Sequence, residues 1–219
     1  MLAPLAAVDE SSLVKIPPHL SFEEAATLPC GALTAWSALL SSRPILPGET
    51  VLTVSSGGVA LFALQFARLF GARVVAVTSS DDKAARLRQL GADAVVNRKA
   101  TPDWSVAVRE LTGGRGVDHV VETGGLDTLP HSIACTAEEA SVNIVAALGI
   151  GSIEVKVFRN PVTIRRVYVG SRTGFETMNR AIGVHALRPV IDRTFAFADA
   201  REAFRYFEAR AHFGKVIIA

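Results

Sequence analysis

The stretch between Val51 and Val77 constrains the fold more than any other, because it reads as strand, tight turn, helix and strand. Residues 51–54 are a short β-prone apolar run, and the four residues Ser-Ser-Gly-Gly that follow can turn sharply. Residues 59–70 place apolar side chains at helical spacing, and residues 73–77 form the next apolar strand. Two strands joined through a buried helix form a βαβ unit, whose strands are parallel and whose crossover is right-handed. We therefore expect a parallel sheet.

The turn of this unit is a candidate phosphate site. The unpaired N–H groups that open a helix carry the positive end of its dipole and favour an anion. The dinucleotide fingerprint G-x-G-x-x-G/A falls on Ser55, Gly57 and Ala60, so that only its first position departs from the pattern. A serine there demands a less permissive backbone, although its hydroxyl can donate to a phosphate. The alternative is a glycine pair that serves helix–strand packing. The candidate pyrophosphate turn is Ser55, Ser56, Gly57, Gly58 and Val59.

The remaining pattern alternates strands with helices. We expect strands at 94–97, 118–122, 142–147 and 166–170, and helices from 81 to 90, 104 to 111, 129 to 140 and 177 to 185. Six strands in alternation with helices indicate an α/β fold with a doubly wound parallel six-stranded sheet, that is, a Rossmann fold. Its cofactor crevice lies beyond the carboxyl ends of the strands.

The two ends of the chain do not continue this alternation. Residues 13–16 are strand-like, and Ser21 with Glu24 predicts a capping box that opens a helix, broken near Pro29. Extended stretches at 189–197 and 215–219 flank a helix that begins with Asp199 and Glu202. These two strands have no evident partner in the main sheet. They either pair with the lead-in near residue 13 or belong to a further domain.

Composition excludes several classes of protein. Lysine and arginine outnumber aspartate and glutamate by only 23 to 21, which offers no electrostatic footprint for nucleic acid or an anionic membrane. The two cysteines cannot form a disulfide framework and fit a reducing, cytoplasmic compartment. The first ten residues do not resemble a signal peptide, and no apolar run approaches the length of a membrane span. We expect a cytoplasmic protein with a small-molecule substrate.

Several motifs in order carry a family resemblance: LSFEEAATLPCGALTAWSAL, LPGETVL, GGVALFALQFA, GARVVAVTSS, LGAD, TGGRGVDHVVE, GSRTGFETMNRAI, RPVIDRTFAF and HFGKVI. With these the chain resembles the cofactor-binding half of medium-chain dehydrogenases/reductases, in the zinc-type alcohol dehydrogenase-like and quinone oxidoreductase-like branch. The resemblance implies a GroES-like catalytic domain that is largely absent. It assigns residues 1–20 to a remnant of that domain, 21–186 to the NAD(P)-binding domain and 187–219 to the return of the chain to the catalytic domain.

The residues after the second strand decide between the two nicotinamide dinucleotides. An acidic residue there would bind the ribose hydroxyls of NAD, but the sequence reads Thr78-Ser79-Ser80. Hydroxyls together with Lys83 and Arg98 would accept a 2′-phosphate, which favours NADP, with NAD as the alternative. Asn97 is a further candidate contact. The two cations can equally be solvated, with Asp81 and Asp82 simply capping a helix.

The resemblance also assigns residues to the nicotinamide side, although glycines often simply end strands. These candidates are Thr34, Thr123, Gly124, Gly125, Ala147, Leu148, Gly149, Val169, Gly170 and Ser171, and Lys215 can approach the cofactor from the C-terminal return or guard an edge strand.

Cys30 is the only candidate metal ligand, because the cysteine of this segment binds catalytic zinc in zinc-dependent relatives. Zinc needs three protein ligands, and the resemblance places the other two in the absent domain. We therefore expect a buried, inert thiol and no zinc, and we expect Cys135 to be a core residue. His119, His131, His185 and His212 are expected to be surface or packing residues.

The sequence thus predicts an oxidoreductase that transfers a hydride between a nicotinamide cofactor and a carbonyl or an activated C=C bond. The catalytic residues remain unidentified, and turnover is expected to be impaired or to depend on a partner. The alternative is a non-catalytic dinucleotide-binding or interaction protein. Free strand edges near Ile191 and Val216 favour a homodimer.

Overall fold

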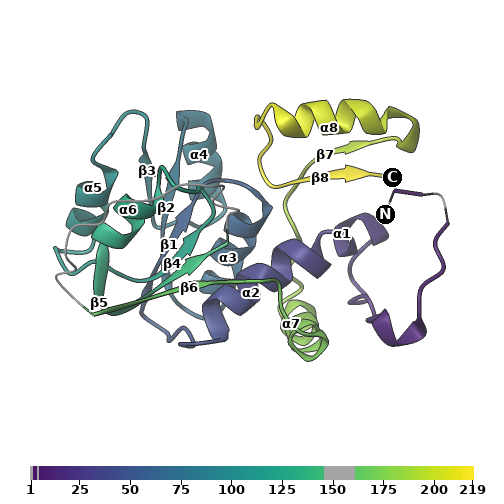
Figure 1. Cartoon of the computed structure of the whole chain (residues 1–219), viewed down its shortest axis with the longest axis horizontal. Helices are drawn as coiled ribbons and strands as arrows, with labels where there is room; N and C mark the ends of the chain where they lie inside the picture. Colours follow the sequence, from purple (N-terminus) through teal and green to yellow (C-terminus); the bar gives the residue numbers. More distant parts are fainter. Residues whose placement is uncertain (1, 4, 146–160) are drawn as a thin grey trace.

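The computed structural model describes residues 2–3, 5–145 and 161–219 and centres on a six-stranded sheet (Figure 1). The strands pair in the order β3-β2-β1-β4-β5-β6, and every pair is parallel. Because the order runs outward in two directions from β1 and β4, the predicted doubly wound α/β fold is confirmed. The strands are β1 (Thr50–Val54), β2 (Arg73–Thr78), β3 (Ala94–Asn97), β4 (Val117–Glu122), β5 (Thr136–Ile144) and β6 (Val162–Arg166).

Helices cover both faces of this sheet. The side chains of β2 alternate between two cores: Val74 and Ala76 belong to one, and Val75 and Val77 belong to the other. The first core is completed by α2 (Leu33–Leu40), α3 (Gly58–Leu69), α4 (Asp81–Gln89) and α7 (Arg172–Val184), and the second by α5 (Trp104–Leu111) and α6 (Leu129–Ala134). The helix α1 (Phe22–Ala25) has the predicted capping box of Ser21 and Glu24, and a π-helical turn at Leu28–Ala32 joins it to α2. None of the helices in the described ranges is both long and apolar enough to cross a membrane.

Three predicted boundaries in the second half are wrong. The helix predicted for 129–140 ends at Ala134, because Thr136 pairs with β4 and residues from Ala140 onward pair with β6 and β4, although alanine and glutamate favour a helix. The strand predicted for 166–170 lies at 162–166, where it pairs with β5. The helix predicted for 177–185 starts at Arg172, because Ser171 caps it by accepting a hydrogen bond from the Gly174 amide at 3.1 Å.

The C-terminal strands pair with each other. β7 (Ile191–Phe195) lies parallel to β8 (Lys215–Ile218), with α8 (Ala200–Glu208) between them in sequence. Figure 1 shows this yellow unit beside the main sheet. Residues 13–16 form no strand, contrary to the prediction, so the alternative in which β7 and β8 pair with the lead-in is wrong. The Gly214 amide donates to the Ser56 carbonyl at 3.0 Å, which ties the unit to the turn after β1.

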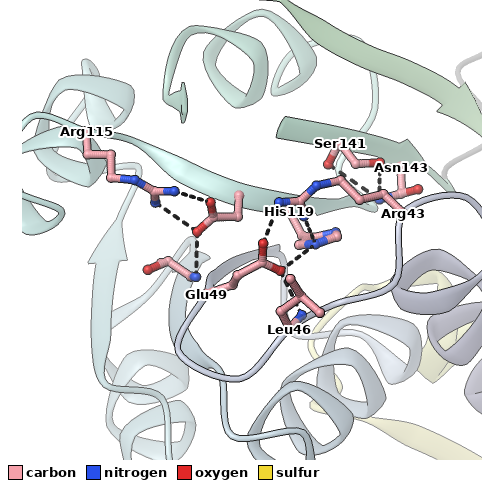
Figure 2. A network of polar contacts seen from close by, with 9 residues as sticks. Arg43, Leu46, Glu49, Arg115, His119, Ser141 and Asn143 are labelled. Atoms are coloured by element: carbon pink, nitrogen blue, oxygen red, sulfur yellow. Dashed lines mark hydrogen bonds and ion pairs between the residues drawn. The ribbon is translucent and has the colours of Figure 1, made fainter. Parts of the chain in front are cut away.

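A polar network joins β1 and β4 at their amino ends (Figure 2). Nε2 of His119 lies 2.5 Å from Nη1 of Arg43 and 3.1 Å from Oε2 of Glu49. His119 is fully buried, and its Nδ1 has no partner among the described residues. Burial lowers the pKa of this imidazole. His119 is therefore a packing residue, as predicted, and belongs to the edge of the sheet opposite the turn after β1.

Candidate functional site

The candidate cofactor residues follow the carboxyl ends of neighbouring parallel strands and therefore meet at one edge of the sheet. Residues 55–58 follow β1, residues 78–80 end or follow β2, residues 97–98 end or follow β3, and residues 123–125 follow β4. In a doubly wound sheet the crevice opens where the strand order reverses, here between β1 and β4.

The turn after β1 presents an open helix N-terminus. Ser55 has a backbone φ of +91°, in the region that favours glycine, and its Oγ accepts a hydrogen bond from the Gly57 amide at 3.1 Å. The helix α3 then begins at Gly58 with no side-chain cap and no acidic residue in its first turn. Its first N–H groups are thus left for an anion.

Lys215 lies directly over this helix start. A Cβ on Gly58 would fall 2.3 Å from Cδ of Lys215, and one on Gly31 would fall 3.2 Å from its Nζ. Burial lowers the pKa of Lys215, and no carboxylate among the described residues forms an ion pair with its ammonium group. The stem of Lys215 thus packs on Gly58, and its ammonium group lies near Gly31, close to the uncapped start of α3. An ammonium group close to a helix N-terminus fits a pyrophosphate group.

The end of β2 is enclosed by the loop that precedes β8. Ser80 caps α4 by accepting from the Lys83 amide at 3.4 Å, and Nζ of Lys83 donates to the Arg210 carbonyl at 3.1 Å. Asn97 donates to the Asp81 carboxylate at 2.9 Å. Arg98 is exposed, Ser79 is half-buried, and Thr78 is buried within β2.

The loop after β4 is held by a carboxylate that sequence reasoning missed. Oε1 of the fully buried Glu122 accepts hydrogen bonds from the amides of Gly124 at 2.6 Å and Gly125 at 3.2 Å, and from Oγ1 of Thr128 at 2.8 Å. Ser132 donates to Oε2, and Thr123 donates to the Val54 carbonyl. An acidic residue that ends an apolar strand and precedes Thr-Gly-Gly was the signal available in the sequence. Glu122 positions Gly124 and Gly125 at the crevice.

The other nicotinamide candidates differ in their surroundings. Thr34 is buried and donates to the Cys30 carbonyl at 2.6 Å, and Gly170 packs against Leu33 and Ser37 of α2. Val169 has a φ of +38°, which is unusual for a β-branched residue. Leu33 and residues 169–171 line a cavity of about 550 Å³ between α7 and the lead-in. Ala147, Leu148 and Gly149 lie outside the described residues.

The two cysteines lie in opposite environments. Cys30 is exposed, so the predicted burial is wrong, because nothing in the described chain covers this side of the π-helical turn. Cys135 is a core residue as predicted, and burial raises the pKa of its thiol to about 12. Within residues 2–3, 5–145 and 161–219, no three His, Cys, Asp or Glu side chains gather as a metal site would require.

Comparison with known proteins identifies relatives of this architecture. The zinc-binding dehydrogenase family matches residues 58–184. A zinc-type alcohol dehydrogenase-like protein of Schizosaccharomyces pombe is 40% identical over 216 residues, which is 94% of this chain and 62% of that protein. The chain thus spans about three fifths of the length of its first relatives.

Solved structures agree with this match. A putative alcohol dehydrogenase from Sinorhizobium meliloti 1021 has a TM-score of 0.92 and 36% identity, over 96% of this chain and 62% of that one. A protein described as an NAD-dependent alcohol dehydrogenase has a TM-score of 0.84 and 35% identity, with coverage of 96% and 62%. The mycobacterial protein Rv1454c, solved with NADPH, has a TM-score of 0.78 and 31% identity, with coverage of 93% and 68%. Because the family match extends over more than half of the chain, this chain belongs to the zinc-binding dehydrogenase family of the medium-chain dehydrogenase/reductase superfamily.

Proposed function

We propose that this chain binds a nicotinamide dinucleotide for an oxidoreductase that reduces a carbonyl or an activated C=C bond. The observation that carries the proposal is that Lys215 packs on Gly58 at the uncapped start of α3, which brings an ammonium group close to a helix N-terminus. The bound nicotinamide supplies the hydride, while the chain binds and orients it. In this assignment Ser55 to Val59 and Lys215 hold the pyrophosphate, and residues 123–125 and 169–171 flank the nicotinamide. Thr34, Ala147, Leu148 and Gly149 are proposed on the same side.

NADP is the proposed cofactor, with NAD as the alternative. Ser79 and Ser80 stand where an NAD-binding protein places a carboxylate, and Lys83 is held beside them by Arg210. The carboxylate of Asp81, which follows Ser80, accepts a hydrogen bond from Asn97. We further propose Arg98, which is exposed, as a second cation for the 2′-phosphate.

The proton donor or Lewis acid of the reaction is proposed to come from outside residues 21–186. In the proposed domain division, residues 1–20 and 187–219 border a catalytic domain. The residues present do not require zinc. The 550 Å³ cavity beside residues 169–171 is proposed to receive the acceptor substrate. A dinucleotide-binding protein without catalysis is the competing function.

Calorimetric titration with NADPH and with NADH tests the binding proposal. Lys215→Met should weaken the binding of both cofactors at least about tenfold, because a charge-assisted hydrogen bond contributes about 1.5–3 kcal/mol. Lys15→Met, which removes an exposed lysine of the lead-in, serves as the matched control. Absence of binding by the unaltered chain would overturn the proposal. Binding without NADPH oxidation over a panel of quinones and enones would favour the non-catalytic function.

We also propose a cytoplasmic homodimer. The two free cysteines suit a reducing compartment. The strands near Ile191 and Val216 pair with each other, so each keeps one unpaired edge, and β6 likewise has a partner on one side only within the described residues. Of these edges, β6 is the proposed dimer contact. Light scattering at micromolar concentration should give twice the chain mass, and Thr163→Pro on β6 should give a monomer. A strictly monomeric unaltered chain would contradict the dimer.

A further inference from the structure

A cluster of basic groups gathers where the loop before β8 meets the first turn of α4. Nζ of Lys83 donates to the Arg210 carbonyl, and two residues later the His212 imidazole lies close enough for the charges of both Lys83 and Lys215 to act on it. Sequence reasoning treated His212 as a packing or surface residue. The hydrogen bond from Lys83 to Arg210 fixes the loop that carries His212 against α4.

The His212 ring is fixed and has one nitrogen available. It stacks on the Phe207 ring of α8, with centroids 4.6 Å apart and an interplanar angle of 15°. Nδ1 is inaccessible to solvent and has no hydrogen-bond partner in the described parts of the chain, whereas Nε2 is not enclosed in this way. An external group can therefore reach this imidazole only through Nε2.

The charges around His212 do not balance. Asp192 of β7 is the one carboxylate among the described groups that acts on it, and that carboxylate already accepts from Tyr206 at 2.5 Å and from Arg86 at 3.4 Å. Burial, Lys83 and Lys215 lower the pKa of His212, and Asp192 opposes them. The imidazole of the free protein is thus neutral at pH 7, in a region with excess positive charge.

We propose that His212 contacts the 2′-phosphate of NADP(H) through Nε2 and takes up a proton when that phosphate binds. The inference rests on the proposed cofactor function and adds a proton-linked selector to it. A 2′-phosphate is largely a dianion above about pH 6.5. A dianion beside Nε2 compensates the positive charges of the two lysines and favours the imidazolium. This electrostatic stabilisation outweighs the cost of a buried Nδ1–H without a hydrogen-bond partner. NADH carries no such group, so its binding moves no proton here.

Adenosine 2′,5′-bisphosphate and AMP isolate this end of the cofactor. Between about pH 6.5 and 8.5, affinity for the bisphosphate should fall by up to about tenfold per pH unit, whereas AMP affinity should stay flat. Calorimetry in buffers of different ionisation enthalpy should count the uptake of up to about one proton with the bisphosphate alone. His212→Gln should remove both effects, and His185→Gln, which alters an exposed histidine at the end of α7, should remove neither.

Lys83→Met provides a test that does not depend on how His212→Gln folds. Removing this charge raises the pKa of the free imidazole. If His212 is the titrating group, the pH at which bisphosphate affinity begins to fall should therefore move upward, and an unchanged pH would contradict the inference. A proton count or pH slope that persists in folded His212→Gln, or a slope equal for bisphosphate and AMP, overturns the inference and leaves the cofactor function intact. Failure of NADPH, NADH and both nucleotides to bind overturns the proposed function itself.

Discussion

Ser55 combines an unfavourable backbone with a favourable side-chain contact, and two substitutions separate these effects. Its φ of +91° lies where a Cβ destabilises the chain by about 1–2 kcal/mol, while its Oγ accepts from the Gly57 amide, a bond that contributes about 0.5–1.5 kcal/mol. Ser55→Ala loses the bond and keeps the unfavourable φ. Ser55→Gly loses the bond and removes the cost of the positive φ, although the greater flexibility of glycine stabilises the unfolded chain by about 0.5–1 kcal/mol.

The glycine variant should therefore be more stable than the alanine variant by up to about 1 kcal/mol, which is a difference of about 2–4 °C in the midpoint of thermal unfolding for a chain of this size. Scanning calorimetry without cofactor measures it. Because both substitutions release the Gly57 amide equally, NADPH affinity should change to the same extent in the two variants. An alanine variant as stable as the glycine variant would refute the backbone argument, and unequal NADPH affinities would refute the role of the hydroxyl.

Further predictions concern the buried groups. Glu122→Leu should destabilise the fold by about 3 kcal/mol or more relative to Glu122→Gln in urea unfolding, because it leaves three donors, the Gly124 and Gly125 amides and the Ser132 hydroxyl, without an acceptor at about 1–3 kcal/mol each; equal stabilities would contradict this. Because burial lowers the pKa of His119, the histidine of the unfolded state takes up a proton at a higher pH than that of the folded state. The free energy of unfolding should therefore fall as the pH drops below about 6.5, by up to about 1.4 kcal/mol per pH unit. His119→Asn should flatten that slope, whereas a slope unchanged in this variant would assign it elsewhere. Iodoacetamide at pH 8 should label Cys30 and leave Cys135 unmodified in the native protein, as mass spectrometry of the peptides would show; labelling of both would contradict the burial of Cys135.

Local pattern was sufficient for the first half of the sheet. The strands β1, β2, β3 and β4 and the helices between them lie within a residue or two of their predicted positions, because long apolar runs bounded by Ser-Gly and Gly turns leave few alternatives. Prediction was poorer between residues 129 and 185, whereas the C-terminal strands and helix lie close to their predicted positions. The segment Thr136–Ala140 has helix-favouring residues, and pairing with two neighbouring strands overrides that preference.

Sequence by itself determined the parallel α/β fold, the turn after β1 and the serines after β2, since each depends on residues adjacent in the chain. Tertiary structure alone decided which distant groups join them: Lys215 over Gly58, the Arg210 carbonyl against Lys83, and β7 against β8. The physical reason is that a parallel sheet brings strand ends to one edge by pairing, whereas the C-terminal segment reaches that edge through packing and a few long-range hydrogen bonds, such as that from Gly214 to Ser56. Such contacts leave no periodic trace in the sequence.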